Sequence, residues 1–261
     1  MRPTSDEVSS STGVEPWIEE DVSFSFEAEQ LYAVLTLPPG ERPHPAIVLV
    51  TGSVSISTGL LDGASSRTLR GFVNSMVVDG YAVLRRDLRG VGRSTGEAGV
   101  ETIPARASES IAALHYLQTR PDILFDQVGL WGASQASWVI ALAAAEHRVD
   151  VAFIISVSGA GISVADQQVW GIESQSRAAG LGEDDVAKAV LFGRLLVDWQ
   201  LADPKDYMAR VECPVLAFFG ESDVVRPSEV SARLFEEYLN AAGLNRAYLG
   251  RCSRMNSSGC V

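Results

Sequence analysis

Ser134 is the residue of this chain whose surroundings most clearly suggest chemistry. It is the central residue of Gly-Ala-Ser-Gln-Ala, residues 132–136. A short apolar run, Val128 to Trp131, predicts a buried strand before it, and the Ala-rich run through Ala145 predicts a helix after it. The pentapeptide is close to Gly-x-Ser-x-Gly, a turn that exposes a nucleophilic serine between strand and helix. The amides at the start of such a helix can stabilise an oxyanion.

The same pentapeptide has a simpler interpretation. Small residues can make a tight strand-to-helix connection, with Ser134 serving as the helix N-cap. Short motifs match by chance often enough that the pentapeptide alone does not decide between the two interpretations. Ala136 stands where the motif has its last glycine, which is acceptable if the site needs only a small side chain.

A carboxylate that could assist Ser134 follows another predicted strand. Polar clusters end three predicted strands: Thr51-Gly-Ser53, Ser134 itself, and Glu221-Ser-Asp223. Ligands of open parallel sheets bind outside the carboxyl ends of the strands, so these clusters should converge. Serine followed by aspartate is also the chain order of one known type of catalytic triad. By itself, however, Asp223 is more typical of a residue that caps a loop.

A base for Ser134 is harder to find. The only histidines are His44, His115 and His147, and all of them precede Asp223. His44 precedes a predicted strand at its wrong end, and His115 lies on a predicted covering helix. His147 is at the far end of the helix that follows Ser134, roughly 20 Å away at 1.5 Å per residue. We expect none to reach Ser134 and predict that each is a surface or interface histidine.

Cofactor and metal sites are not indicated. The Gly- and Arg-rich loop from Arg85 to Gly96 lacks both nucleotide-binding glycine patterns, so we expect it to shape the rim of the site, with Asp87 paired to an arginine. No group of His, Cys, Asp and Glu has metal-ligand spacing. We therefore predict neither a cofactor nor a metal.

The elements that would position these residues alternate between strand and helix. A half-buried hairpin is predicted for 21–37, and later strands for 46–51, 81–86, 128–131, 151–157 and 214–220. Helices are predicted for 65–79, 104–119 and 227–242, besides the helix after Ser134. This order predicts an α/β fold with a mostly parallel central sheet and helices on both faces.

The domain organisation follows from one long insertion. Residues 162–210 contain no convincing strand and are too many for a connection, which predicts a small helical cap. We divide the chain into a flexible leader (1–16), a core (17–161 and 211–250), the cap (162–210) and an atypical tail (251–261).

Charge and cysteine content exclude several classes of protein. The formal net charge of −12 argues against nucleic acid or an anionic membrane as a partner. Three cysteines without Cys-x-x-Cys spacing argue against a disulfide framework and a structural zinc. With no apolar leader or long apolar run, we expect a cytoplasmic protein of undetermined oligomeric state.

Taken together, four segments resemble the α/β-hydrolase superfamily, and most closely its bacterial esterase-like branch related to dienelactone hydrolases and serine aminopeptidases. They are residues 46–53, 86–96, 132–136 and 213–223. The resemblance implies that Ser134 is the nucleophile and that Asp223 orients a histidine. It also implies an oxyanion hole built from the backbone amides of Gln135 and of Ser53 or Val54.

The chain departs from the family pattern in three places. Thr51 replaces a histidine found in many members, and Ala136 replaces the last glycine of the turn. The family carries its catalytic histidine shortly after the last core strand, where residues 245–261 have none. We hypothesise that this tail is a truncated or frame-shifted end.

The resulting prediction is a serine hydrolase that cleaves small-molecule carboxylic esters or related acyl bonds through an acyl-Ser134 intermediate. The missing histidine predicts poor efficiency. The alternative is a non-catalytic protein of the same fold that serves as a small-molecule or protein binding module.

Overall fold

The structure is a computed structural model that describes residues 17–52, 64–98, 102–196, 203–244, 247–252, 255–256 and 259–260. Its centre is an eight-stranded sheet with the order β1-β2-β4-β3-β5-β6-β7-β8. The predicted leader, residues 1–16, lies outside the described residues.

The predicted hairpin forms the antiparallel edge of the sheet. Strands β1 (Ile18–Phe26) and β2 (Glu29–Leu37) pair from Ile18↔Leu37 to Phe26↔Glu29. Strand β2 then joins the rest of the sheet by pairing antiparallel with β4 (Ala82–Arg86). The half-buried pattern predicted for this hairpin holds for the edge strand β1 but not for β2. Every residue of β2 from Leu31 to Leu37 is buried, because β2 lies between β1 and β4.

The other strands are parallel, as the strand–helix alternation predicts. They are β3 (His44–Val50), β5 (Ile123–Ala133), β6 (Ile154–Val157), β7 (Val215–Gly220) and β8 (Ala247–Cys252). Strand β8 was not predicted. Its residues are largely exposed and carry little apolar signal, and it forms by pairing with β7.

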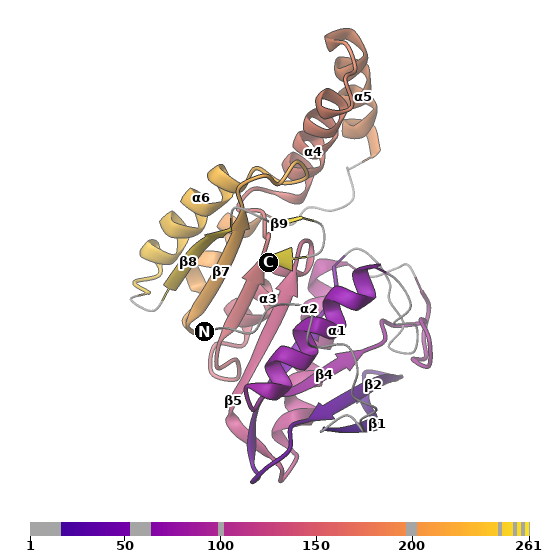
Figure 1. Cartoon of the computed structure of the whole chain (residues 1–261), viewed down its shortest axis with the longest axis vertical. Coiled ribbons are helices and arrows are strands. Elements are labelled where there is room, and N and C mark those ends of the chain that lie inside the picture. Colours follow the sequence, from indigo (N-terminus) through magenta and orange to yellow (C-terminus); the bar gives the residue numbers. More distant parts are fainter. Residues whose placement is uncertain are drawn as a thin grey trace, which may run out of the picture.

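Helices cover both faces of the sheet (Figure 1). Helix α1 (Ala64–Val78) packs Val73 and Val77 against β3 and β4 on one face. Helices α2 (Ile103–Gln118), α3 (Ala136–Glu146) and α6 (Ser228–Ala241) bury their apolar side chains in the larger core cluster on the other. Alternate strand residues supply the two cores, since Val48 contributes to one and Leu49 to the other.

The inserted segment is helical, as predicted. Helices α4 (Val164–Ala178) and α5 (Glu183–Leu196) pack on each other and extend away from the sheet (Figure 1). Two short 3₁₀ turns, Pro204–Asp206 and Met208–Arg210, lead back to β7. The short strands β9 (Met255–Asn256) and β10 (Gly259–Cys260) pair with each other near the end of the chain.

The expectations about disulfide bonds and about His44 were wrong. Cys252 is disulfide-bonded, whereas the cysteine spacing predicted no such link, and Cys213 is the free, buried cysteine of the described residues. His44 is not a surface residue but is 5% exposed at the start of β3. Its backbone amide donates to the carbonyl of Asp122, which packs it under the adjoining loop.

Candidate active site

Ser134 lies on the sharp turn between β5 and α3. Its backbone φ is +60°, in the left-handed region that residues other than glycine rarely adopt. Its amide donates to the carbonyl of Val157 on β6, which holds the turn against the sheet. The N-cap of α3 is Gln135, so the interpretation of Ser134 as an N-cap was wrong.

The small residues around Ser134 are required by close contacts. A Cβ on Gly132 would lie 2.8 Å from the carbonyl oxygen of Ala136 and 3.0 Å from its Cβ. Ala136 itself is fully buried. A methyl group at 136 therefore fits where the motif has glycine, provided that 132 carries no side chain.

Of the residues predicted to form the oxyanion hole, Gln135 lies within the described part of the chain. Gln135 is the N-cap of α3, so its backbone amide lies at the positive end of that helix. Gly52, which follows β3, lies against the turn, since a Cβ built on it would be 3.5 Å from the Cβ of Ser134. The other two predicted donors, Ser53 and Val54, lie outside the described residues.

Arg106 holds together the two segments that carry the predicted oxyanion hole. Its side chain, on α2, is 4% exposed, and its Nη1 donates to Oε1 of Gln135 at 2.7 Å. Its Nη2 donates to the carbonyls of Thr51 and Gly52, the latter at 3.1 Å. One guanidinium therefore ties the end of β3 to the start of α3.

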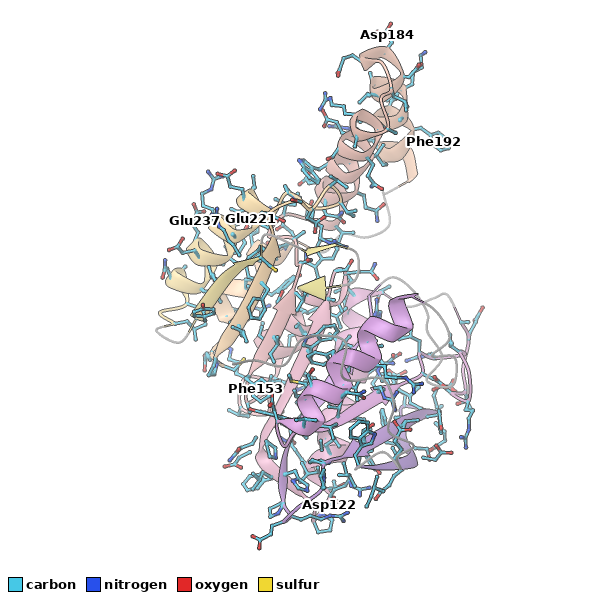
Figure 2. The ribbon with its side chains drawn as sticks, in the orientation of Figure 1. Asp122, Phe153, Asp184, Phe192, Glu221 and Glu237 are labelled. Carbon is cyan, nitrogen blue, oxygen red and sulfur yellow. The ribbon has the colours of Figure 1, made fainter. Side chains whose placement is uncertain are left out.

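Asp223 lies in the turn after β7, close to Glu221, which Figure 2 labels at this end of the sheet. Its Oδ1 accepts from the amides of Val225 and Arg226, at 2.8 and 3.0 Å. This is the loop-capping role that the residue type suggested. Its other oxygen, Oδ2, is paired with Nη1 of Arg226 at 3.0 Å.

Arg226 connects the two predicted catalytic residues. Its Nη2 donates to Oγ of Ser134 at 2.5 Å, while Nη1 binds Asp223. The structure therefore brings Ser134 and Asp223 to the same place, as expected from their positions after parallel strands, but with a guanidinium between them. Sequence reasoning missed Arg226, although its position three residues after Asp223 in the same loop allowed the pairing.

The histidines are elsewhere. All three lie in the described part of the chain, and none of them is hydrogen-bonded to Ser134 there. His44 is at the amino end of β3. His115 and His147 are partly exposed and both pair with Asp150, which agrees with the predicted surface location for these two.

The Arg85–Gly96 loop is held by charge and by backbone hydrogen bonds. Oδ2 of Asp87 accepts from the amide of Arg93 at 2.9 Å. Arg86 and Arg89 both pair with Glu109 on α2, at 2.9 and 3.1 Å, and Glu109 has no exposed surface. This network anchors the loop to α2, the helix that also carries Arg106.

Two further features lie away from Ser134. A cavity of about 700 Å³ between α6 and β8 is lined by none of the predicted site residues. Among the described residues, the ligand atoms of His115, His147 and Asp150 come within 4.8 Å of one another, close enough to share a metal ion.

Within the described part of the chain, no helix has the length and apolar character needed to cross a membrane.

Comparison with known proteins identifies the group to which this architecture belongs. Residues 27–189 match the family model of the X-Pro dipeptidyl-peptidase (S15 family). An uncharacterized 31.7 kDa protein from the traX–finO intergenic region of Escherichia coli is 25% identical over 262 aligned residues, covering 85% of this chain and 86% of that protein. A putative phosphoribosyl transferase of Mycobacterium tuberculosis is 32% identical over 127 residues, which are 48% of this chain and 26% of that protein.

Solved structures share the fold. The esterase Pf2001 of Pyrococcus furiosus superimposes with a TM-score of 0.66 at 16% identity, covering 91% of this chain and 81% of that one. Est1E of Butyrivibrio proteoclasticus, solved with ferulic acid, has a TM-score of 0.59 at 18% identity and covers 88% of each chain. The predicted α/β-hydrolase fold is therefore confirmed.

Proposed function

From the premise that this chain belongs to the S15 family of α/β hydrolases, we propose that it cleaves carboxylic esters or related acyl bonds with Ser134 as nucleophile. The observation that carries the proposal is the backbone of Ser134. A serine at φ +60° between a strand and a helix is strained, and strain of this kind is maintained where the side chain has to be presented.

In the proposed reaction, Oγ of Ser134 attacks the acyl carbon and the carbonyl electron pair moves onto its oxygen. The amide of Gln135 donates to that oxyanion at the positive end of α3. The tetrahedral oxyanion then re-forms the carbonyl and expels the leaving group as a phenolate or stable alkoxide, and water hydrolyses the resulting acyl-serine to release the acid. Arg106 acts as a positioning residue, because it holds the side chain of Gln135 and the carbonyl of Gly52.

Removal of the Ser134 proton is the difficult step. Arg226 cannot accept it, because a guanidinium stays protonated in proteins. Its positive charge and its hydrogen bond to Oγ nevertheless favour the deprotonated oxygen over the neutral hydroxyl. We propose that the proton passes to hydroxide from solvent, while Arg226 stabilises the alkoxide and Asp223 holds Arg226 in place.

This arrangement favours esters over amides. An amine has to be protonated as it leaves, a task that the triad histidine performs in serine proteases. A phenolate or a stable alkoxide can leave without that proton. The expected substrates are therefore activated esters, and the rate should be low, since triads lacking one member retain about 10³–10⁴-fold over water.

The test is hydrolysis of short p-nitrophenyl esters by the wild-type chain and by Ser134→Ala. We expect slow turnover that the substitution lowers at least about tenfold. The matched control is Ser108→Ala, which removes an exposed hydroxyl on α2 and should leave the rate unchanged. Equal rates for the wild type and Ser134→Ala would disprove the assigned nucleophile.

The position of Arg226 also supports a second proposal, that the chain is a binding module without catalytic activity. A guanidinium that occupies the space between Ser134 and Asp223 makes this site resemble a structural salt bridge. A fluorophosphonate probe separates the two functions, because it labels only an activated serine. Labelling of the peptide that contains Ser134 supports the hydrolase, and its absence after prolonged incubation supports the binding module.

A further inference from the structure

We propose that His115, His147 and Asp150 form a binding site for a divalent transition-metal ion, with Zn²⁺ as its natural occupant. His115 is distant in sequence from His147 and Asp150, which are three residues apart. His115 lies in the last turn of α2, His147 is the C-cap of α3, and Asp150 follows in the loop that leads to β6.

The distances suit a tetrahedral ion. Oδ2 of Asp150 lies 3.3 Å from Nε2 of His115 and 3.5 Å from Nδ1 of His147. Two zinc–ligand bonds of about 2.0–2.1 Å at a tetrahedral angle place their ligand atoms about 3.3 Å apart. The ring centroids of the two imidazoles are 6.2 Å apart, and the ligand atoms of all three residues lie within 4.8 Å of one another.

The backbone around the three residues is held in place. The amides of Asp150 and Val151 donate to the carbonyl of His147, which makes a compact turn after α3. Nε2 of Gln118, on α2, donates to the carbonyl of Asp150 at 3.2 Å and links that turn to the helix that carries His115. A metal at this site would therefore meet ligands whose main-chain positions are already set.

The electrostatic surroundings favour a cation. His115 and His147 lie at the carboxyl ends of α2 and α3, where exposed carbonyls give each helix a partial negative charge. Asp150 adds a full negative charge. Two imidazoles with one carboxylate suit zinc and its transition-metal neighbours, whereas Mg²⁺ and Ca²⁺ prefer sites made of oxygen ligands.

The site would be structural and separate from the proposed active site. Helices α2 and α3 both run opposite to the parallel strands, so their carboxyl ends lie at the end of the sheet away from Ser134. Three protein ligands leave one position for water. A bound ion would link the end of α2 to the turn after α3, and would stabilise the fold by binding the native chain in preference to the unfolded one.

The experiment uses the full-length, tag-free protein, freed of metal by a chelator and then dialysed. Isothermal titration with Zn²⁺ should show one ion per chain, and zinc at about 100 times its dissociation constant should raise Tm by about 5 °C. Co²⁺ in place of Zn²⁺ should give the intense visible absorption of a tetrahedral site. Mg²⁺ should leave Tm unchanged.

Variants locate the site. His115→Ala and His147→Ala should each weaken zinc binding at least tenfold, and His115 is half-exposed, so its removal is compatible with folding. The matched control, Asp184→Asn, removes one exposed carboxylate from α5, in the helical insertion that extends away from the sheet (Figure 2), and should bind zinc like the wild type. Ser134→Ala should also bind zinc normally. Absence of zinc binding, or binding that survives both histidine substitutions, would overturn the proposal.

Discussion

The guanidinium of Arg226 lies between Ser134 and Asp223, 2.5 Å from Oγ of one and 3.0 Å from Oδ2 of the other. A histidine in such a position could carry a proton between a serine and a solvent or leaving group, but an arginine cannot. It can only fix the carboxylate and supply positive charge. The chemistry available to Ser134 therefore depends on what occupies this one position.

The position of Arg226 predicts chemical rescue. Arg226→Ala should lower ester hydrolysis, because the alkoxide of Ser134 loses its stabilising charge, and it should open a space beside Asp223. Imidazole added at tens of millimolar can enter that space and act as the base, raising the rate by about tenfold or more. The measurement is p-nitrophenyl acetate hydrolysis as a function of imidazole concentration.

Free imidazole also cleaves this ester directly, so the control is the double variant Ser134→Ala/Arg226→Ala. Only the single variant should show a rate that saturates with imidazole. An identical imidazole dependence in both variants would mean that no base is accepted between Asp223 and Ser134.

The left-handed backbone of Ser134 predicts a difference in stability between two substitutions. Glycine adopts a φ of +60° without steric cost, whereas alanine keeps the strain. Ser134→Gly should therefore unfold with a free energy about 1 kcal/mol higher than Ser134→Ala, as measured by urea denaturation. Equal stability of the two variants would indicate that the turn relaxes once the hydroxyl is gone.

The buried ion pair between Arg86 and Glu109 predicts a large loss of stability. Neither side chain is more than 2% exposed, so Glu109→Gln would leave a buried positive charge without its carboxylate. We expect the free energy of unfolding to fall by about 3–5 kcal/mol. Asp185→Asn, which breaks the exposed pair with Lys188, should change it by less than about 1 kcal/mol in the same urea titration.

His44 predicts a pH dependence of stability. Burial, with Arg42 nearby, holds the pKa of His44 below its ordinary value of 6.5, and Asp122 opposes the shift. Below pH 6.5 the unfolded chain therefore binds a proton that the folded chain does not, and stability falls as the pH is lowered. Above pH 6.5 the imidazole is neutral in both states and contributes no slope.

Urea titrations between pH 8 and pH 5 measure this effect, and His44→Gln should remove His44's part of the slope. Asp122 also has a lowered pKa, chiefly through its hydrogen bond with Arg120, but its contribution is lost only as the pH falls below 3.8. The two residues therefore act in different pH ranges. A wild-type slope that persists in His44→Gln would assign the effect to other groups.

Much of the fold follows from local sequence. The alternating residues of β1, the apolar run of β3 and the strand–turn–helix around Ser134 are each specified by residues close in the chain. Gly80 and Gly243, which follow α1 and α6, have the positive φ that glycine adopts readily at the ends of helices. Such features depend on backbone preference and on the periodicity of burial, which neighbouring residues alone express.

Other features needed the tertiary structure. The exposed strand β8 forms because β7 offers an open edge, and His44 is buried because the loop that contains Asp122 packs over it. Arg226, which pairs with Asp223, also binds Ser134, a residue 92 positions earlier in the chain. The histidine pair is brought together by two helices that end at the same side of the sheet.

A mostly parallel α/β sheet, a serine on a sharp turn and an aspartate after a later strand could all be predicted from the sequence, because each depends on short-range pattern. The residue that lies between that serine and that aspartate, and the pairing of two histidines, could be found only from the folded chain. Those outcomes depend on the direction and reach of side chains such as that of Arg226, which are set by the packing of the whole sheet rather than by spacing along the chain.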